Sequence, residues 1–192
     1  MAKLDKRAEV RRRKKLRQYS FVAGTLAVVA LVLAAAWAFS PQPPGPLSTT
    51  GRQCATIVTP HGEIVAVIYT DLVPQTGARF ASLFQGGYYN ALVWTRGPPE
   101  EDWVVQAGQG GSSRDPIPLE INPSVKNIRG SLGAARTNDP NSATTQFYIL
   151  KRDSSHLDAG YSVFGTVISG MTAVDQILKN ETITRTSLAP CA

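Results

Sequence analysis

The sequence predicts a mainly β protein: a closed antiparallel β-barrel capped by two α-helices and preceded by a single N-terminal transmembrane helix. Three observations predict this arrangement. Short runs rich in β-branched residues alternate with Gly, Pro and Asn through residues 52–192, which is typical of an antiparallel barrel. Two stretches of this region instead space their apolar residues as a helix does. An apolar run at residues 19–40 precedes the whole region.

The net charge of +6 is concentrated at the N-terminus. Nine of the 20 Lys and Arg residues and two of the 14 Asp and Glu residues lie in positions 1–17, so this segment carries +7 and the remainder −1. Residues 1–18 are therefore predicted to form a basic cytoplasmic tail. The same arithmetic excludes a basic binding face spread over the domain, and we expect no nucleic-acid partner.

Residues 19–40 contain no ionisable group other than Tyr19. As a helix they span roughly 33 Å, which matches the bilayer core of about 30 Å and predicts a transmembrane signal anchor with the lipid bilayer as its partner. The flanking cations predict an N-terminus in the cytoplasm. A signal peptide cleaved near Ala36-Trp37-Ala38 is the alternative. Both interpretations export the rest of the chain.

Residues 41–51 are predicted to be a linker. Four prolines lie between Pro41 and Pro46, and such a segment favours an extended polyproline spacer over packing. The exported domain then occupies residues 52–192.

The chain has two cysteines, Cys54 and Cys191, at the two ends of this domain. An even number of cysteines in an exported chain predicts a disulfide, which here would tie the first strand to the last residues. Two unpaired thiols are the alternative. No metal site is expected, because two distant cysteines without clustered histidines are too few ligands.

Within the domain, QCATIVTP at 53–60 and GEIVAVIYT at 62–70 are β-branched runs divided by the turn Pro60-His61-Gly62, which predicts an opening hairpin. Five further short strands are predicted where apolar runs alternate with turn residues: 91–95, 103–106, 130–135, 145–150 and 162–167.

Two helices are predicted between these strands. The first begins at Pro74, which suits a first helical turn, and stops at Gly86-Gly87; the second covers residues 171–179. The domain holds only two histidines, and its Gly-rich stretch lacks the Lys-Ser/Thr of a phosphate loop. The residues alone therefore favour neither a nucleophilic triad nor phosphate chemistry.

One segment, RGSLGAARTNDPNSATTQFYI at residues 129–149, resembles the signature of bacterial cyclophilin-type peptidyl-prolyl cis-trans isomerases. Three other segments match this family in the same order: GEIVAVIYTDLVPQTGARFASL at 62–83, WVVQAG at 103–108 and LDAGYSVFGTVISGMTAVDQI at 157–177. The resemblance implies an eight-stranded antiparallel barrel with two capping helices. It also implies isomerase activity on proline-containing polypeptides without a cofactor.

By this resemblance, the catalytic residues are Arg96, Gln106 and Gln146. Rotation about an X-Pro bond breaks amide resonance, and a guanidinium that donates to the prolyl nitrogen favours the twisted form over the planar one. The two glutamines match positions that bind the substrate backbone or support the arginine. The resemblance assigns the proline pocket and substrate groove to seven more residues: Trp103, Val104, Ala135, Arg136, Tyr148, His156 and Leu157.

This chain departs from the family pattern around the pocket. Thr95 and Tyr161 stand where many members have His, Trp103 and Tyr148 where Phe is usual, and Val104 where Met is usual. His156 replaces the Trp of cyclosporin-sensitive relatives, which implies weak binding of that drug.

The segment between Arg96 and Gln106 is also longer than the family pattern and contains Glu100, Glu101 and Asp102. These carboxylates would lie beside the pocket, pair with Arg96 or Arg136 and compete with substrate.

We therefore expect a monomeric prolyl isomerase that assists the folding of exported proteins. It would be held in a bacterial cell membrane by residues 19–40, with its catalytic domain outside the cytoplasm. Two alternatives remain: a tethered module that binds proline-containing peptides with little turnover, and a tethered structural protein whose pocket is vestigial.

Overall fold

The computed structural model describes residues 52–108 and 115–191. The predicted basic tail, transmembrane helix and linker, residues 1–51, lie outside these ranges. Among the described residues, no helix combines the length and the apolar character needed to cross a bilayer.

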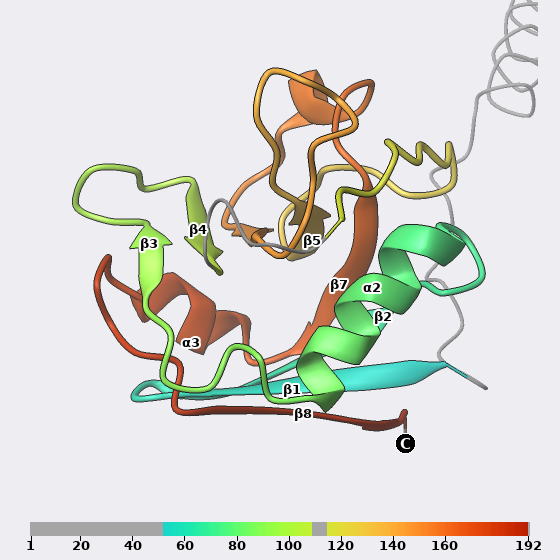
Figure 1. Ribbon diagram of the computed structural model, residues 1–192. Helices are drawn as coiled ribbons and strands as arrows, with labels where there is room; N and C mark the ends of the chain where they lie inside the picture. Colours follow the sequence, from blue (N-terminus) through green and yellow to red (C-terminus); the bar gives the residue numbers. More distant parts are fainter. Residues whose placement is uncertain (1–51, 109–114, 192) are drawn as a thin grey trace, which may run out of the picture. The chain divides into compact units, whose positions relative to one another are not determined.

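Strands outnumber helices among the described residues (Figure 1). The chain forms, in order, β1 Gln53–Thr59, β2 Gly62–Ile68, α2 Pro74–Gln85, β3 Trp94–Arg96, β4 Val104–Ala107, β5 Ser131–Ala134, β6 Phe147–Leu150, the 3₁₀ turn η1 Ser155–Leu157, β7 Val163–Ser169, α3 Met171–Gln176 and β8 Arg185–Pro190.

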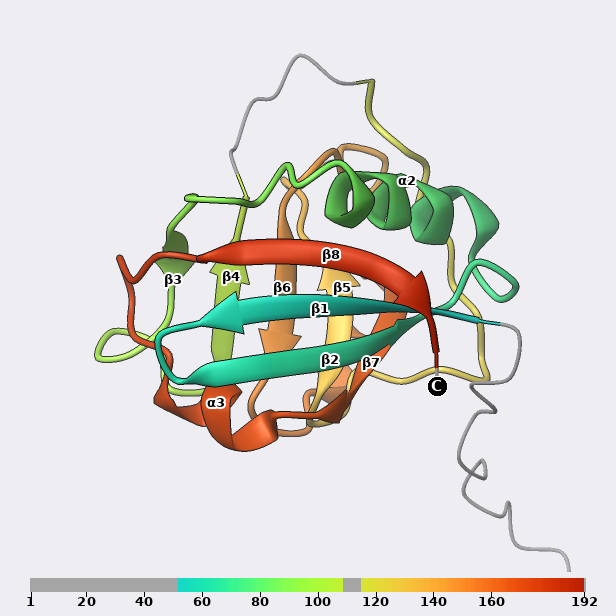
Figure 2. The same ribbon diagram turned by 90° about the horizontal axis from the view of Figure 1, so that it is seen from below.

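The eight strands form one antiparallel sheet in the order β3-β4-β6-β5-β7-β2-β1-β8. The sheet curls so that β8, β1 and β2 cross in front of β4, β6 and β5 (Figure 2). Its two end strands, β3 and β8, do not form a ladder with each other. The seam is instead bridged just outside them by the isolated pair Val93 and Thr182. The expected barrel is thus present as a curled sheet whose closure rests on a short bridge.

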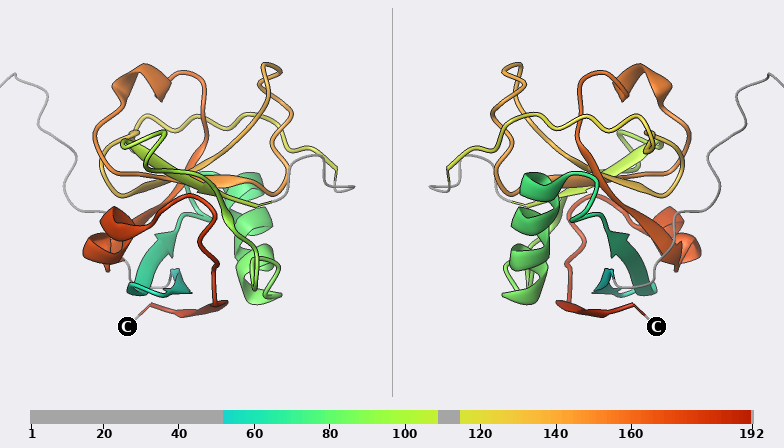
Figure 3. Two further views of the ribbon diagram at one scale, coloured as in Figure 1. Left: turned by 90° about the vertical axis from the view of Figure 1, so that its left-hand side faces the viewer. Right: turned by 90° about the vertical axis from the view of Figure 1, so that its right-hand side faces the viewer.

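The two helices lie on opposite sides of β1 and β2 (Figures 2 and 3). Helix α2 begins at Pro74, as predicted, because a first-turn residue needs no intrahelical N–H bond. At Gly77 a Cβ atom would lie 2.6 Å from the Tyr69 carbonyl oxygen, so only glycine permits this close approach to the end of β2. Phe80 of α2 stacks on Phe164 of β7, with ring centroids 4.0 Å apart.

The main core lies inside the curl. Its largest side chains are fully buried, and Phe147 of β6 contacts the rings of Phe84, Tyr89 and Trp94 at centroid distances of 5.4, 4.9 and 5.7 Å. Such a set of edge-on aromatic contacts fixes the position of β6 relative to α2 and β3.

The predicted disulfide is present between Cys54 and Cys191, with 4.9 Å between their Cα atoms. Strand β1 pairs with β8, so the two ends of the domain are neighbours and the bond closes a loop of 137 residues.

Three elements differ from the sequence predictions. The strand predicted at 91–95 starts only at Trp94, because Ala91 has a φ of 61° and ends a series of turns. The helix predicted at 171–179 stops at Gln176, since Ile177 is extended. Strand β8 was not predicted, because RTSLAP lacks an apolar run and only Thr186 of it is buried.

Candidate active site

A second, smaller hydrophobic cluster lies on the outer face of the sheet. Its buried members are Val104, Ala135, Tyr148 and Leu150, and Trp103, Leu157 and Tyr161 pack against them. We call these seven residues the pocket cluster, because five of them are among those that the resemblance assigns to the proline pocket and substrate groove. Along β6, Phe147 and Ile149 belong to the main core, whereas Tyr148 and Leu150 belong to the pocket cluster. This alternation follows from the two-residue period of a strand.

Arg96 is the last residue of β3 and extends toward the pocket cluster. Its guanidinium carbon lies 5.9 Å from the centroid of the Trp103 ring. Nη1 of Arg96 donates to Oε1 of Gln106 at 3.0 Å. The pairing of Arg96 with Gln106 in the ladder between β3 and β4 brings these two side chains together.

The two glutamines extend this contact into a chain of hydrogen bonds. Nε2 of Gln106 donates to Oε1 of Gln146 at 3.2 Å, and Nε2 of Gln146 lies 3.5 Å from the Gly108 carbonyl oxygen. Gln106 is buried and Gln146 half-buried. The three residues that the resemblance assigned to catalysis thus form one polar row beside the apolar cluster.

Tyr148 forms the floor of the pocket cluster. It pairs with Gly133 of β5, and a Cβ atom on that glycine would lie 2.0 Å from Cζ of Tyr148, so the ring fills the space that a side chain would occupy. Its hydroxyl donates to Oδ1 of the buried Asn127 at 2.6 Å. Burial raises the pKa of the Tyr148 phenol, which therefore remains a neutral donor.

Aromatic residues and a fixed cation border this floor. The Tyr161 ring lies 6.0 Å from that of Tyr148, and the Arg136 guanidinium carbon lies 4.3 Å from the Tyr161 centroid. Nε of Arg136 donates to the Gly160 carbonyl and Nη1 to that of Thr137, each at 2.7 Å. Arg136 is thereby held in place by carbonyl oxygens and an aromatic face.

On the opposite border, Trp103 and the exposed His156 have ring centroids 6.3 Å apart. Leu157 and Ala135 contribute the remaining apolar wall. Thr95, which replaces the usual His, is exposed and donates through its hydroxyl to the Gln106 carbonyl at 3.2 Å.

The three carboxylates of the longer loop have different partners. Glu101 accepts from Nε and Nη2 of Arg96 at 2.7 and 2.8 Å, while Glu100 pairs with Lys179. Asp102 is 3.7 Å from Arg152, and both of these side chains are largely exposed. The sequence left open whether the acidic loop pairs with Arg96 or with Arg136. In the structure, Glu101 of the loop pairs with Arg96.

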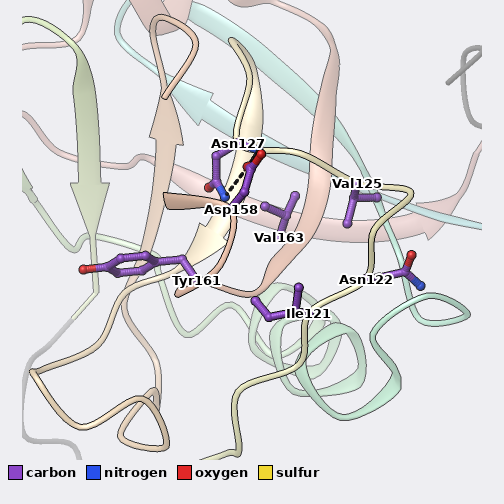
Figure 4. A pocket seen from close by; sticks show the side chains of 7 residues that line it. All are labelled: Ile121, Asn122, Val125, Asn127, Asp158, Tyr161 and Val163. Carbon is purple, nitrogen blue, oxygen red and sulfur yellow. Dashed lines mark hydrogen bonds between the residues drawn. The ribbon is translucent and has the colours of Figure 1, made fainter. Parts of the chain in front are cut away.

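A shallow depression adjoins the pocket cluster through Tyr161. Figure 4 shows Asn127 and Asp158 turned toward each other, and Nδ2 of Asn127 donates to Asp158 at 3.2 Å. The Tyr161 ring points away from Asn122 and Val125. Asn127 also accepts the hydrogen bond from the Tyr148 hydroxyl, so this depression supports the Tyr148 floor.

Sequence reasoning did not identify Asn127 or Gly133 as parts of the site. A glycine within a predicted strand is a signal of close approach by another group. Nothing in the sequence marks Asn127. No group of three or more metal-binding side chains occurs within residues 52–108 and 115–191.

The fold and the site place an apolar cluster beside the Arg96 guanidinium on the outer face of the sheet. A family model described as cyclophilin type peptidyl-prolyl cis-trans isomerase matches residues 54–190. Peptidyl-prolyl cis-trans isomerase B of Escherichia coli is 35% identical over 136 residues, which are 64% of this chain and 82% of that protein. Peptidyl-prolyl cis-trans isomerase A of Dickeya dadantii is 32% identical over 168 residues, covering 82% of this chain and 85% of the relative.

Solved structures show the same fold. A cyclophilin type peptidyl-prolyl cis-trans isomerase of Cryptosporidium parvum superposes with a TM-score of 0.64 at 20% identity and covers 73% of this chain and 99% of its own. A second structure of that protein was determined in the presence of the dipeptide Ala-Pro and superposes with a TM-score of 0.60. The chain belongs to the cyclophilin-type peptidyl-prolyl cis-trans isomerases, and its activity is that of a peptidyl-prolyl cis-trans isomerase.

Proposed function

We propose that this isomerase acts on proline-containing segments of exported proteins, with Arg96 stabilising the twisted prolyl amide. The observation that carries this proposal is the polar row of Arg96, Gln106 and Gln146 beside the pocket cluster. An apolar surface next to a hydrogen-bond donor suits a proline ring whose own nitrogen must accept a bond during rotation.

The mechanism follows from amide resonance. Planarity of the peptide bond imposes a rotational barrier of about 18–20 kcal/mol. When the C–N bond twists, the nitrogen lone pair leaves the π system and becomes a hydrogen-bond acceptor. A guanidinium N–H aimed at this nitrogen binds the twisted state better than the planar state, and only such differential binding accelerates the reaction.

The pocket cluster supplies the second requirement, a fixed end for the rotation. Trp103, Val104, Leu157 and the Tyr148 ring offer an apolar surface for the pyrrolidine ring. The chain on the other side of the bond then turns while the ring is held. No covalent intermediate or proton transfer is needed, which is consistent with a site built from Arg, Gln and apolar residues.

The cellular setting is also part of the proposal. The apolar segment 19–40 and the basic residues before it support a signal anchor in a bacterial cell membrane. The Cys54–Cys191 disulfide supports an oxidising compartment outside the cytoplasm. Protease added to intact spheroplasts tests this topology: degradation of the domain with protection of residues 1–18 is expected, and protection of the domain would contradict it.

The catalytic proposal is tested with the full-length chain in detergent. Exchange between the cis and trans forms of a proline tetrapeptide is measured by NMR for the wild type and for Arg96→Ala. We expect the substitution to lower kcat/KM by about 10² to 10³, because it removes a donor aimed at the rotating bond. Arg129→Ala is the matched control, since Arg129 pairs with Asp175 outside the pocket cluster. Equal rates for Arg96→Ala and the wild type would refute the role of Arg96.

A second candidate function is a peptide-binding module with little turnover. The Glu101–Arg96 ion pair favours it, because a carboxylate on the guanidinium reduces the charge available to the substrate. Chemical-shift changes on adding the tetrapeptide, without any increase in exchange rate, would select this function.

A further inference from the structure

The loop between β3 and β4 carries a carboxylate that engages Arg96 at two points. Nε of Arg96 donates to Oε2 of Glu101 at 2.7 Å, and Nη2 donates to Oε1 at 2.8 Å. This side-on arrangement uses both carboxylate oxygens and fixes the plane of the guanidinium, which a single bond would leave free to turn.

A third bond comes from the opposite side. Nη1 of Arg96 donates to Gln106, so three of the five guanidinium N–H groups are engaged. One N–H on Nη1 and one on Nη2 have no partner among residues 52–108 and 115–191. Glu101 therefore occupies one edge of the guanidinium and leaves donors on both terminal nitrogens for a ligand.

Immobilising the Arg96 guanidinium would lower the entropic cost of catalysis. The Arg96 side chain is 42% exposed and that of Glu101 is 31% exposed. A long side chain with this exposure samples several rotamers, and immobilising it during the reaction costs up to about 2 kcal/mol of rotamer entropy. A partner that immobilises it beforehand removes this cost from the rotation step.

The loop that carries Glu101 is itself anchored. The Glu101 N–H donates to the Gly97 carbonyl at 3.2 Å, and the Lys179 N–H donates to the Pro98 carbonyl at 3.0 Å. The Lys179 ammonium also pairs with Glu100. The backbone bond from Lys179 ties the loop to the segment after α3, whereas the exposed Glu100–Lys179 ion pair adds little, so the Glu101 carboxylate is presented from a backbone that does not depend on Glu100.

We propose that Glu101 is a positioning residue for the isomerisation: it orients the Arg96 guanidinium and so increases turnover. The inference rests on the proposed role of Arg96. It reverses the expectation from the sequence that the acidic loop competes with substrate, because the carboxylate binds the Nε edge and the terminal nitrogens keep free donors.

The test compares Glu101→Gln with Glu100→Gln in the full-length chain. Gln at position 101 keeps the size of the side chain but is uncharged and has one acceptor oxygen, so it cannot accept from Nε and Nη2 on two separate oxygens. We expect kcat for the tetrapeptide to fall about tenfold with KM within twofold, since a misaligned catalytic group costs up to about 100-fold. Glu100→Gln, the same change one residue earlier on the partner of Lys179, is expected to stay within twofold of the wild type in both constants.

A spectroscopic readout separates positioning from general loop stability. In ¹H–¹⁵N spectra the Arg96 Nε–H signal, assigned through its loss in Arg96→Lys, is expected to be resolved in the wild type and in Glu100→Gln. In Glu101→Gln it is expected to broaden through exchange with water.

The possible outcomes separate a failure of the positioning role of Glu101 from a failure of the proposed isomerase function of Arg96. An increase of kcat/KM in Glu101→Gln would show competition with substrate and overturn the positioning role. Unchanged kcat in Glu101→Gln beside an active wild type would overturn the positioning role alone. A wild type without any catalysis would overturn the proposed function together with this inference.

Discussion

Strand β6 presents two different surfaces, and adjacent residues show the contrast. Phe147 points into the main core, where it is fully buried among aromatic rings. Tyr148 points to the outer face, where its ring covers Gly133 and its hydroxyl bonds Asn127. The inner side chain packs among aromatic rings, whereas the outer one combines an apolar face with a hydrogen-bonded hydroxyl.

The difference separates stability from function within one strand. Burial of apolar surface inside the curl stabilises the fold by about 25 cal/mol per Å² and needs no partner of particular chemistry. The outer face exposes apolar surface next to Arg96, Gln106 and Gln146, so it is available to bind another molecule. Substitutions on the two faces should therefore affect different measurements.

The largest expected effect on stability concerns the Cys54–Cys191 disulfide, which joins the two ends of the domain. Replacing Cys54 and Cys191 together by Ser is expected to lower the free energy of unfolding by about 4–5 kcal/mol, because the bond spans 137 residues of the unfolded chain. Both cysteines pack with the main core and neither belongs to the pocket cluster. Guanidinium denaturation checks the loss, and kcat/KM measured well below the unfolding midpoint should be unchanged. A loss below about 1 kcal/mol would contradict the chain-entropy argument.

On the inner face, Phe147→Ala is expected to lower the free energy of unfolding by about 3–5 kcal/mol, because it leaves a cavity among the rings of Phe84, Tyr89 and Trp94. The thermal midpoint, followed by circular dichroism, should fall accordingly. A loss under about 1 kcal/mol would mean that the core relaxes around the cavity. Substitutions on the two faces of β6 would then differ less in their effect on stability than the packing indicates.

On the outer face, Tyr148→Phe changes one atom at the neighbouring position. The substitution removes the hydrogen bond to Asn127, which is 1% exposed. It should lower the free energy of unfolding by about 1–2 kcal/mol, because the buried amide oxygen of Asn127 then lacks this donor. The ring still covers Gly133, so kcat/KM is expected to stay within about twofold of the wild type. A loss of unfolding free energy as large as that of Phe147→Ala would show that the outer face depends on the Tyr148 hydroxyl for its stability more than on the apolar ring.

The smallest effect is expected for an ion pair that belongs to neither the main core nor the pocket cluster, Arg129 with Asp175. The hydrogen bonds from Arg129 lower the pKa of Asp175 in the folded state. The pair therefore stabilises the fold above the unfolded carboxyl pKa, and this contribution is lost as the pH falls through the folded value. Because both side chains are over 40% exposed, we expect Asp175→Asn to cost less than about 1 kcal/mol at pH 7.

Denaturation curves recorded between pH 7 and pH 2 check this last prediction. The difference between Asp175→Asn and the wild type should shrink as the pH falls below the ordinary Asp value of about 4. A difference that grew toward acid pH would mean that the carboxyl is stabilised in its protonated form.

Much of the fold was predictable because its signals are local. The hairpin of β1 and β2 follows from β-branched runs around a turn, and α2 follows from Pro74 and helical spacing. Strand β8 was not predictable in this way, because its polar sequence becomes a strand only by pairing with β1. The same holds for Val93, whose bridge to Thr182 depends on where two distant segments meet.

For the site, the sequence by itself determined which side chains are present: the signature around Arg136 and Gln146, the arginine at position 96, and the acidic loop after it. The predictions for residues 1–51 stay predictions from sequence, outside the described residues. Only the tertiary structure decided that Glu101 pairs with Arg96 and not with Arg136, and that Tyr148 reaches Asn127. The physical reason is that residue type fixes what a side chain can donate or accept, whereas the partner depends on the path of the backbone that brings distant segments together.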